Sequence, residues 1–237
     1  MNAPKQMQLM ELRYQERSGL RDRNRYTIFY SRLCTADLAV FGINPGGDPG
    51  DPNKLKWAST TYYENWEHEY VDSRYRIQGV MLPFLKNVLA TNNEGVRKIP
   101  KANLAFRRSK GEDSFKANHG MTLTQAMHEA MPTICEILKF VSPKMIILEG
   151  MKDQKFRTLY CSGSTKQIRD PIWDKHRGKN VRVLEAANMY VNCLERELPI
   201  IALGHPSSFG KKPVWGSSVI PAVRKMIQQF GISVACG

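Results

Sequence analysis

The stretch that most constrains the fold is Leu38–Gly47, which reads LAVFGINPGG. Its apolar run from Leu38 to Phe41 stops at glycine, asparagine and proline residues. Continuous apolar residues between turn-forming residues predict a short strand that is buried on both faces and ends in a tight loop. In open α/β sheets, the loops at the carboxyl ends of the strands hold the ligand. We therefore expect a ligand site at this loop, where Asn44 carries the hydrogen-bonding side chain.

Similar apolar runs recur along the chain and alternate with segments of helical spacing. Further strands are expected at Ile99–Phe106, Pro143–Gly150, Val181–Ala187 and Pro199–Leu203. Helices are expected at Gly79–Ala90, from Thr122 to about Phe140, and from a cap at Ser217 or Ser218 through Phe230. Strands that alternate with helices imply right-handed crossovers. The predicted fold class is α/β, with one domain at residues 37–237 and a mostly parallel central sheet of about four strands flanked by helices.

The net charge indicates a polyanionic partner. The chain has 35 Lys and Arg residues against 22 Asp and Glu residues, which gives +13. Cations that neutralise phosphates release counterions, so a basic face binds nucleic acid without sequence preference. A basic but inert surface is the alternative. Residues 1–36 are rich in arginine and are expected to form a basic helical extension, with a possible break at Gly19.

The sequence shows no membrane or cofactor signature. No apolar run reaches the roughly 18–20 residues of a membrane helix, and the first residues lack the apolar core of a signal peptide. The 5 cysteines are widely spaced and form no CxxC or Cys/His ligand pattern, which argues against an iron–sulfur or zinc site. We expect an intracellular, monomeric protein that is not secreted, does not contact a membrane and uses no metal or organic cofactor.

Three of the predicted strands end in polar or glycine-rich loops, and a parallel sheet brings these loops to one edge. Asn44 can orient a water but cannot act as a strong base. Asn103 presents a carboxamide whose acceptor and donors match N3–H and O4 of uracil, respectively. His205 can donate a hydrogen bond to an oxygen that gains negative charge. A turn asparagine, a satisfied buried amide and a structural histidine are the respective alternatives.

Aromatic residues are concentrated after the first loop. Tyr62, Tyr63 and Trp66 are the candidates for stacking on a planar base, and core packing is the alternative for each of them.

A second group of residues is suited to holding a nucleic acid. Serine hydroxyls bind phosphates, and an apolar wedge beside cations suits a protein that unstacks a base while it grips the backbone. The candidate DNA contacts are Ser207, Ser208, Phe209, Lys211, Lys212, Arg107 and Arg108.

Two of these motifs together resemble the uracil-DNA glycosylase superfamily. GINPG at residues 42–46 is similar to the motif of the mismatch-specific uracil and thymine-DNA glycosylases. HPSS at residues 205–208 is similar to the histidine loop of the ordinary and single-strand-selective uracil glycosylases. The resemblance covers residues 38–230 and implies the glycosylase-like α/β fold.

The resemblance also implies roles for individual residues. Asn44 takes the position of the group that places the hydrolytic water, where the ordinary uracil enzymes have an aspartate. Gly46 takes the position of a tyrosine that blocks the thymine methyl, which implies a wider pocket. His205 corresponds to the histidine that contacts a uracil oxygen, and Phe209 to the residue that fills the place of the flipped base. The implied base-binding residues are Gly42, Ile43, Gly46, Asn103, Tyr62, Tyr63 and Trp66.

The predicted function is therefore that of a monofunctional DNA glycosylase in base-excision repair. It would hydrolyse the N-glycosidic bond of uracil or another deaminated or damaged base and leave an intact abasic site. One alternative is a non-catalytic nucleic-acid-binding protein with the same fold. The other is an enzyme that acts on a small nucleotide or metabolite in the same strand-end pocket.

Overall fold

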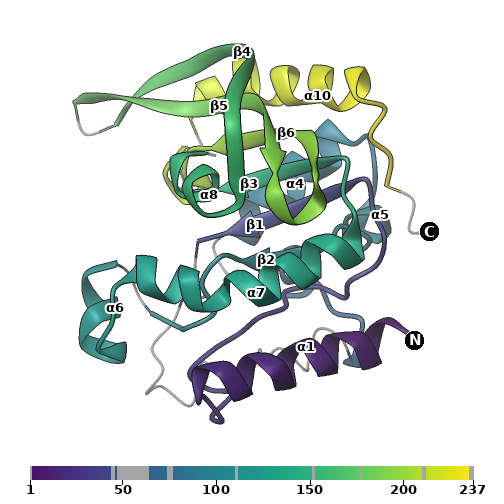
Figure 1. Ribbon diagram of the computed structural model, residues 1–237. Coiled ribbons are helices and arrows are strands. Elements are labelled where there is room, and N and C mark those ends of the chain that lie inside the picture. Colours follow the sequence, from purple (N-terminus) through teal and green to yellow (C-terminus); the bar gives the residue numbers. More distant parts are fainter. Residues whose placement is uncertain are drawn as a thin grey trace.

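The computed structural model describes residues 2–43, 46, 64–73, 77–109, 112–150, 153–176, 178–209 and 212–234. In this part of the chain, a mixed sheet of six strands forms the centre of the molecule (Figure 1). The strand order is β2-β1-β3-β6-β5-β4. The strands are β1 (Leu38–Gly42), β2 (Lys101–Asn103), β3 (Met145–Glu149), β4 (Cys161–His176), β5 (Lys179–Val191) and β6 (Arg196–Leu203).

The sheet confirms the α/β class but differs from the prediction in size and direction. Strands β2, β1, β3 and β6 are parallel, whereas β5 and β4 form an antiparallel hairpin at one edge. The predicted strand Val181–Ala187 lies within β5. Strand β4 was not predicted, because most of its residues are exposed or half-buried and it contains Pro171. A strand without a buried face has no hydrophobic period to detect.

Strand β1 shows how the sheet divides two hydrophobic clusters. All of its residues are buried. Ala39 and Phe41 belong to one cluster, and Leu38 and Val40 belong to the other. Because successive side chains of a strand point to opposite faces, a continuous apolar run is what a sheet covered on both faces requires.

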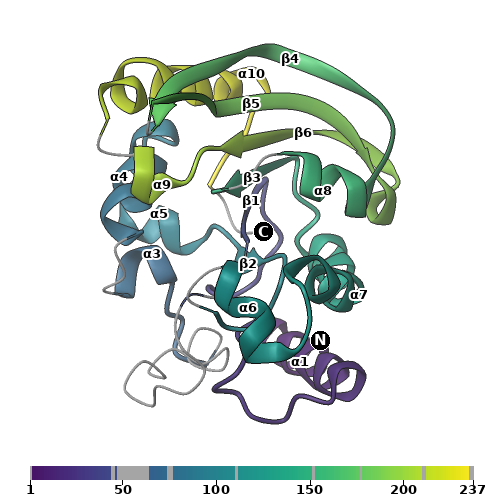
Figure 2. The ribbon, with the colours of Figure 1, turned by 90° about the vertical axis from the view of Figure 1, so that its left-hand side faces the viewer.

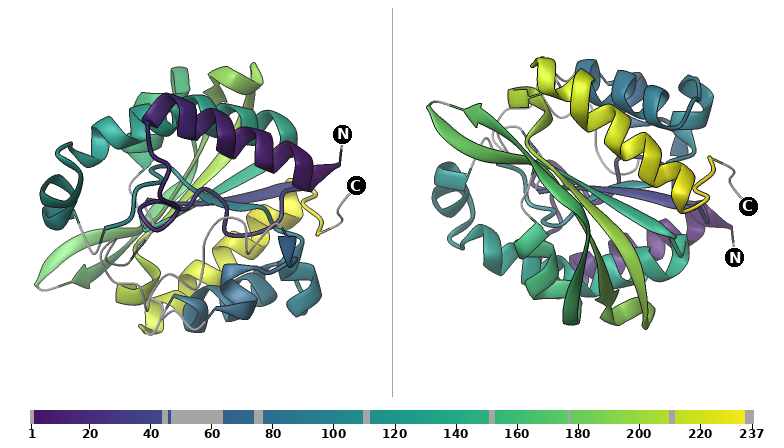
Figure 3. Two further views of the ribbon diagram at one scale, coloured as in Figure 1. Left: turned by 90° about the horizontal axis from the view of Figure 1, so that it is seen from below. Right: turned by 90° about the horizontal axis from the view of Figure 1, so that it is seen from above.

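Helices cover each of these faces, as Figures 2 and 3 show. The first cluster contains residues of α1 (Ala3–Ser18), α6 (Glu112–His119), α7 (Leu123–Val141) and α8 (Asp153–Tyr160). The second contains residues of α3 (Glu69–Asp72), α4 (Gln78–Val88), α5 (Asn93–Arg97) and α10 (Ile220–Gln229). Shorter helical segments are η2 (Asn192–Leu194), α9 (Pro206–Phe209) and η3 (Trp215–Val219).

Local capping signals set several helix ends. Helix α1 ends at Gly19, whose φ of 69° is the left-handed conformation that glycine adopts readily. Helix α7 begins with the expected cap, since Thr122 and Gln125 form a reciprocal capping box. The expected cap at Ser217 or Ser218 is wrong. Both serines lie inside the π-helical turn η3, because the helical segment already begins before them.

The amino-terminal helix is part of the same core as the sheet. Met7, Met10 and Tyr14 of α1 are at most 1% exposed and join the first cluster. The chain then runs antiparallel to β2, with single bridges from Tyr26 to Arg107 and from Phe29 to Ala102. The arginine-rich segment therefore buries its apolar side chains against α7 and the sheet.

None of the helices in the described ranges combines the length and the apolar character that crossing a lipid bilayer requires.

Helix α3 begins at His68, a histidine with no exposed surface. Its Nδ1 accepts a hydrogen bond from the backbone N–H of Tyr70 at 3.1 Å, so the proton lies on Nε2, which donates to the carbonyl oxygen of Ile99 at 3.0 Å. Burial lowers the pKa of His68 to about 3, and the positive charge of Lys101 acts in the same direction. The folded protein therefore holds this ring neutral.

We predict that His68 makes the protein sensitive to acid. Because its pKa is lower in the folded state, unfolding takes up a proton below about pH 6.5, and stability falls by up to about 1.4 kcal/mol per pH unit as the pH drops toward 3. Urea unfolding of His68→Asn should show a lower free energy at about pH 7.5 but a shallower loss toward about pH 5.5. His128→Asn, at an exposed position of α7, is the control. Equal pH slopes for wild type and His68→Asn would contradict the prediction.

Candidate active site

The parallel strands β2, β1, β3 and β6 all end at one edge of the sheet. Gly42 at the end of β1 is paired with Asn103 of β2, and Glu149 at the end of β3 is paired with Leu203 of β6. The helices that follow β1, which are α3, α4 and α5, pack in the second cluster, whereas α8, which follows β3, packs in the first. Neighbouring connections on opposite faces define the topological switch point at which α/β proteins bind ligands.

Gly42 is required by close packing at this edge. A Cβ atom at this position would lie 2.2 Å from Oδ1 of Asn103 and 2.8 Å from Oε1 of Glu149. Only a residue without a side chain allows the carboxamide and the carboxylate to lie against the end of β1. The first glycine of the GINPG motif is therefore explained by the two polar groups that it admits.

Asn103 presents a buried amide with open hydrogen-bonding capacity. The residue is 3% exposed, and within the described ranges its side chain forms no hydrogen bond. The polar atoms of this amide keep some contact with solvent, because neither is among the fully buried side-chain atoms that lack a partner. A side-chain amide without a protein partner at a topological switch point is available to hydrogen-bond a ligand.

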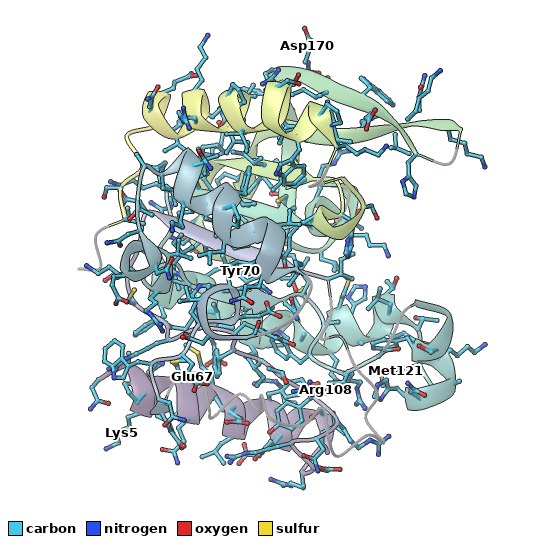
Figure 4. All side chains as sticks on the ribbon, turned by 180° about the vertical axis from the view of Figure 1, so that it is seen from behind. Lys5, Glu67, Tyr70, Arg108, Met121 and Asp170 are labelled. Atoms are coloured by element: carbon cyan, nitrogen blue, oxygen red, sulfur yellow. The ribbon has the colours of Figure 1, made fainter. Side chains whose placement is uncertain are left out.

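Beneath this edge lies a group of buried charges. The ammonium group of Lys101 contacts a carboxylate oxygen of Glu69 and lies 2.9 Å from Oε1 of Glu149. The other oxygen of Glu149 accepts a hydrogen bond from the hydroxyl of Tyr70, which Figure 4 labels in the interior of the molecule. We call Glu69, Tyr70, Lys101 and Glu149 the buried charge cluster.

The pKa values in the buried charge cluster follow from burial and mutual attraction. Burial by itself lowers the pKa of Lys101, but the carboxylates of Glu149 and Glu69 outweigh it and the net pKa is raised. Burial raises the pKa of Glu69, and the charge of Glu149 adds to this while Lys101 opposes it. Burial and both carboxylates raise the pKa of Tyr70, so its hydroxyl remains a donor. Lys101 also lies 4.6 Å from the ring centroid of Tyr30.

The sequence carries a signal for this cluster. Glu149 ends the apolar strand MIILE, and Lys101 begins the short strand KAN. A charged residue within a strand that is otherwise buried needs a partner of opposite charge. The identity of the partner was not visible, because the members are far apart in the chain.

His205 follows β6 and packs on the end of β3. Gly150 has a φ of 72°, and a Cβ atom there would lie 2.8 Å from Cδ2 of His205. The imidazole thus covers the backbone at the turn after Glu149, while the residue as a whole is exposed. The backbone N–H of Ser208 donates to the carbonyl oxygen of His205 at 2.9 Å at the start of α9.

The structure therefore brings together part of the predicted site. Gly42, Asn103 and His205 lie at the carboxyl edge of the parallel strands, and half-buried Ile43 is tied to the chain after β2 by a hydrogen bond from Ala105. Gly46 and Ser208 are exposed, and Ser207 and Phe209 belong to α9. The predicted residues that lie outside the described ranges are Asn44, Tyr62, Tyr63 and Lys211.

Trp66 lies apart from this edge. It is 63% exposed, and the guanidinium carbon of Arg32 is 2.9 Å from its ring centroid. The two residues line a groove together with Lys98, which precedes the start of β2. Among the three candidate aromatics, Trp66 is therefore not placed to stack on a base held by Asn103 at the end of β2.

Arg107 and Arg108 do not face outward as the DNA-contact prediction requires. They are 7% and 3% exposed. Arg107 donates two hydrogen bonds to Glu129, at 3.0 and 2.6 Å, and Arg108 donates to the hydroxyl of Thr27. Buried guanidinium groups need such partners. Both arginines fasten the segment after β2 to the neighbouring elements, and we do not assign them to DNA.

No family model matches the sequence, and no curated protein matches it significantly. In the part of the chain that the structure describes, no group of three His, Cys, Asp or Glu side chains is placed to hold a metal ion.

We predict that Lys101→Met destabilises the protein by about 3–5 kcal/mol, because it leaves two buried carboxylates without their cation. Urea unfolding measures the loss. The triple variant Lys101→Met/Glu69→Gln/Glu149→Gln removes the uncompensated charges and should recover part of the stability. A single variant within about 1 kcal/mol of wild type would show that the cluster is not electrostatically coupled.

Proposed function

We propose that the protein is a DNA glycosylase that hydrolyses the N-glycosidic bond of uracil or another deaminated base and leaves an intact abasic site. The observation that carries this proposal is the open carboxamide of Asn103 at the switch point, beside Gly42 and on the same edge as His205. The GINPG and HPSS motifs support it. We further propose that the enzyme acts as an intracellular monomer in DNA repair.

Asn103 would select the base. A carboxamide has an acceptor oxygen and a donor nitrogen side by side, which complement N3–H and O4 of uracil. Its environment strengthens the selection, because Asn103 is 3% exposed and a mismatched base would leave the buried amide unpaired.

His205 would stabilise the leaving base. Breaking the glycosidic bond places negative charge on the base, and an imidazole N–H donated to a base oxygen lowers the free energy of that anion. Asn44 would hold the attacking water without removing its proton in the ground state. Glu149 is committed to Lys101 and Tyr70, so we assign it to positioning rather than to proton transfer. Most of the acceleration must then come from stabilising the leaving group.

Water is the nucleophile in this reaction, and it supplies all the atoms that the products require. The N-glycosidic bond breaks, a C–O bond forms at the anomeric carbon, and the water proton ends on the released base. No redox step and no organic cofactor is required. The charge of +13 fits a DNA substrate. It fits equally well a non-catalytic protein that binds DNA and does not hydrolyse the N-glycosidic bond.

The direct test is base release. Single-stranded and double-stranded oligonucleotides that carry uracil, a G·U mismatch, hypoxanthine or xanthine are incubated with the protein and then heated in alkali. We expect strand breaks at uracil only after the alkali step, because no lysine is assigned to form a Schiff base. DNA binding without release from any of these substrates would identify a non-catalytic DNA-binding protein. Turnover of free nucleotides alone would identify the small-substrate enzyme.

We predict that Asn103→Asp lowers kcat/KM for uracil by about 100-fold or more, since it replaces the amide donor by a carboxylate of equal size. His205→Ala should lower kcat by about 100- to 1,000-fold with little change in KM, because its hydrogen bond strengthens in the transition state. His128→Ala is the matched control, and circular dichroism establishes that each variant is folded. If Asn103→Asp has the kinetics of the wild type, Asn103 does not bind the base.

A further inference from the structure

The β4–β5 hairpin extends beyond the edge at which the candidate site lies. Leu203, the last residue of β6, is paired with Leu184 of β5. Residues 179–182 of β5 and residues 173–176 of β4 continue past that point, and within the sheet they pair with each other. Figure 1 shows the hairpin reaching past the other strands on the side where the parallel strands end. We call residues 173–176 and 178–182 the hairpin tip.

The sequence of the hairpin is rich in cations. From Lys166 to Arg182, six side chains are Lys or Arg and two are Asp. Lys175 and Lys179 are exposed, and neither ammonium group takes part in an ion pair within the described residues. Figure 4 shows side chains standing outward from this hairpin, on which Asp170 is labelled.

An exposed aromatic ring accompanies these cations. Trp173 is 51% exposed, and the guanidinium carbon of Arg182 lies 5.1 Å from its ring centroid. Arg182 also forms an ion pair with Glu185 at 2.8 Å. An indole held beside a cation, next to unpaired ammonium groups, is the combination that nucleic-acid-binding surfaces use.

Two contacts attach the hairpin tip to the segment that follows His205. The ammonium group of Lys212 lies 2.9 Å from Oδ2 of Asp174 and donates a hydrogen bond to the carbonyl oxygen of Lys175. The backbone N–H of Gly204 donates to the carbonyl oxygen of Val183 at 2.9 Å. The tip therefore has a set position beside the loop that carries the candidate catalytic histidine.

Protection of a sheet edge does not explain the whole of this surface. Edge strands often carry lysine, proline and register shifts that prevent pairing with another chain, and β4 has Pro171 and register shifts. Lys179 and Arg182 lie where β5 has passed the end of β6 and is an edge as well, so edge protection covers their charges too, but it does not account for the exposed ring of Trp173 beside Arg182. An exposed indole together with cations on both strands, beyond the end of the sheet, indicates a polyanion that lies across the tip.

We propose that the hairpin tip is a DNA-binding arm in which Lys175 and Lys179 contact the phosphates that flank the nucleotide held at the candidate site. The choice of DNA as the polyanion rests on the proposed function. Neither the GINPG nor the HPSS motif includes the hairpin, so the arm would add phosphate contacts to those made by the motif loops. Trp173 is placed to pack against a sugar or an unstacked base next to these phosphates.

The test compares two double variants with the same change in charge. Lys175→Gln/Lys179→Gln alters the tip, and Lys139→Gln/Lys225→Gln alters exposed positions on α7 and α10. Binding of a fluorescein-labelled, uracil-containing duplex is measured by anisotropy between about 0.05 and 0.2 M potassium chloride. We expect the slope of log K against log salt to be about 1.8 smaller for the tip variant, since each lost phosphate contact removes about 0.9. The control pair should keep the wild-type slope.

The outcomes separate this proposal from the proposed function. The proposal of a DNA-binding arm would be refuted if the two double variants had equal slopes of log K against log salt, or if the wild type did not bind DNA. A reduced slope for the tip variant without base release by the wild type would retain the arm and refute the glycosylase. Base release with equal slopes would retain the glycosylase and refute the arm.

Discussion

The attraction between Lys101 and the carboxylates of Glu69 and Glu149 is the interaction on which the candidate site depends. An isolated charge at this depth would cost several kcal/mol, and the pairs are tolerated because each charge has a partner. The three residues come from β2, α3 and β3, so the same attraction joins a helix to two strands that are not paired with each other. It also holds Glu149 in place below Gly42 and Asn103. Removal of the lysine is therefore expected to disturb both the fold and the site.

Glycine occupies two strand ends at which polar side chains pack against the backbone. Gly42 admits Asn103 and Glu149, and Gly150 admits His205. Each glycine lets a polar side chain from a neighbouring strand lie over the end of its own strand. Both glycines allow a close approach, and Gly150 also has the positive φ that favours glycine. The edge thus carries an amide, an imidazole and a supported carboxylate.

The cations of the chain are divided between the interior and the surface. Lys101, Arg107 and Arg108 are buried against protein partners, and their charges serve the fold. Lys175 and Lys179 are exposed on a hairpin that extends past the site. A net charge counted from composition does not separate these two populations, although only the second is able to attract a phosphate backbone over a distance.

The sequence by itself determined the features that depend on local pattern. The apolar runs of β1, β3 and β6 and the capping box of α7 follow from hydrophobic period and turn chemistry. The predicted sheet of about four mostly parallel strands is instead a mixed sheet of six, in which the parallel strands place Asn103 and His205 at one edge. The tertiary structure decided what depends on distant partners. Lys101 meets Glu149, Arg107 meets Glu129, and Trp66 lies beside Arg32 away from the strand ends. The hairpin strand β4 has no buried face and so no hydrophobic period. The partners of a charged residue and the pairing of an exposed strand are set by residues far away in the chain, so they become known only from the folded structure. A buried apolar run, in contrast, is predicted from its own residues.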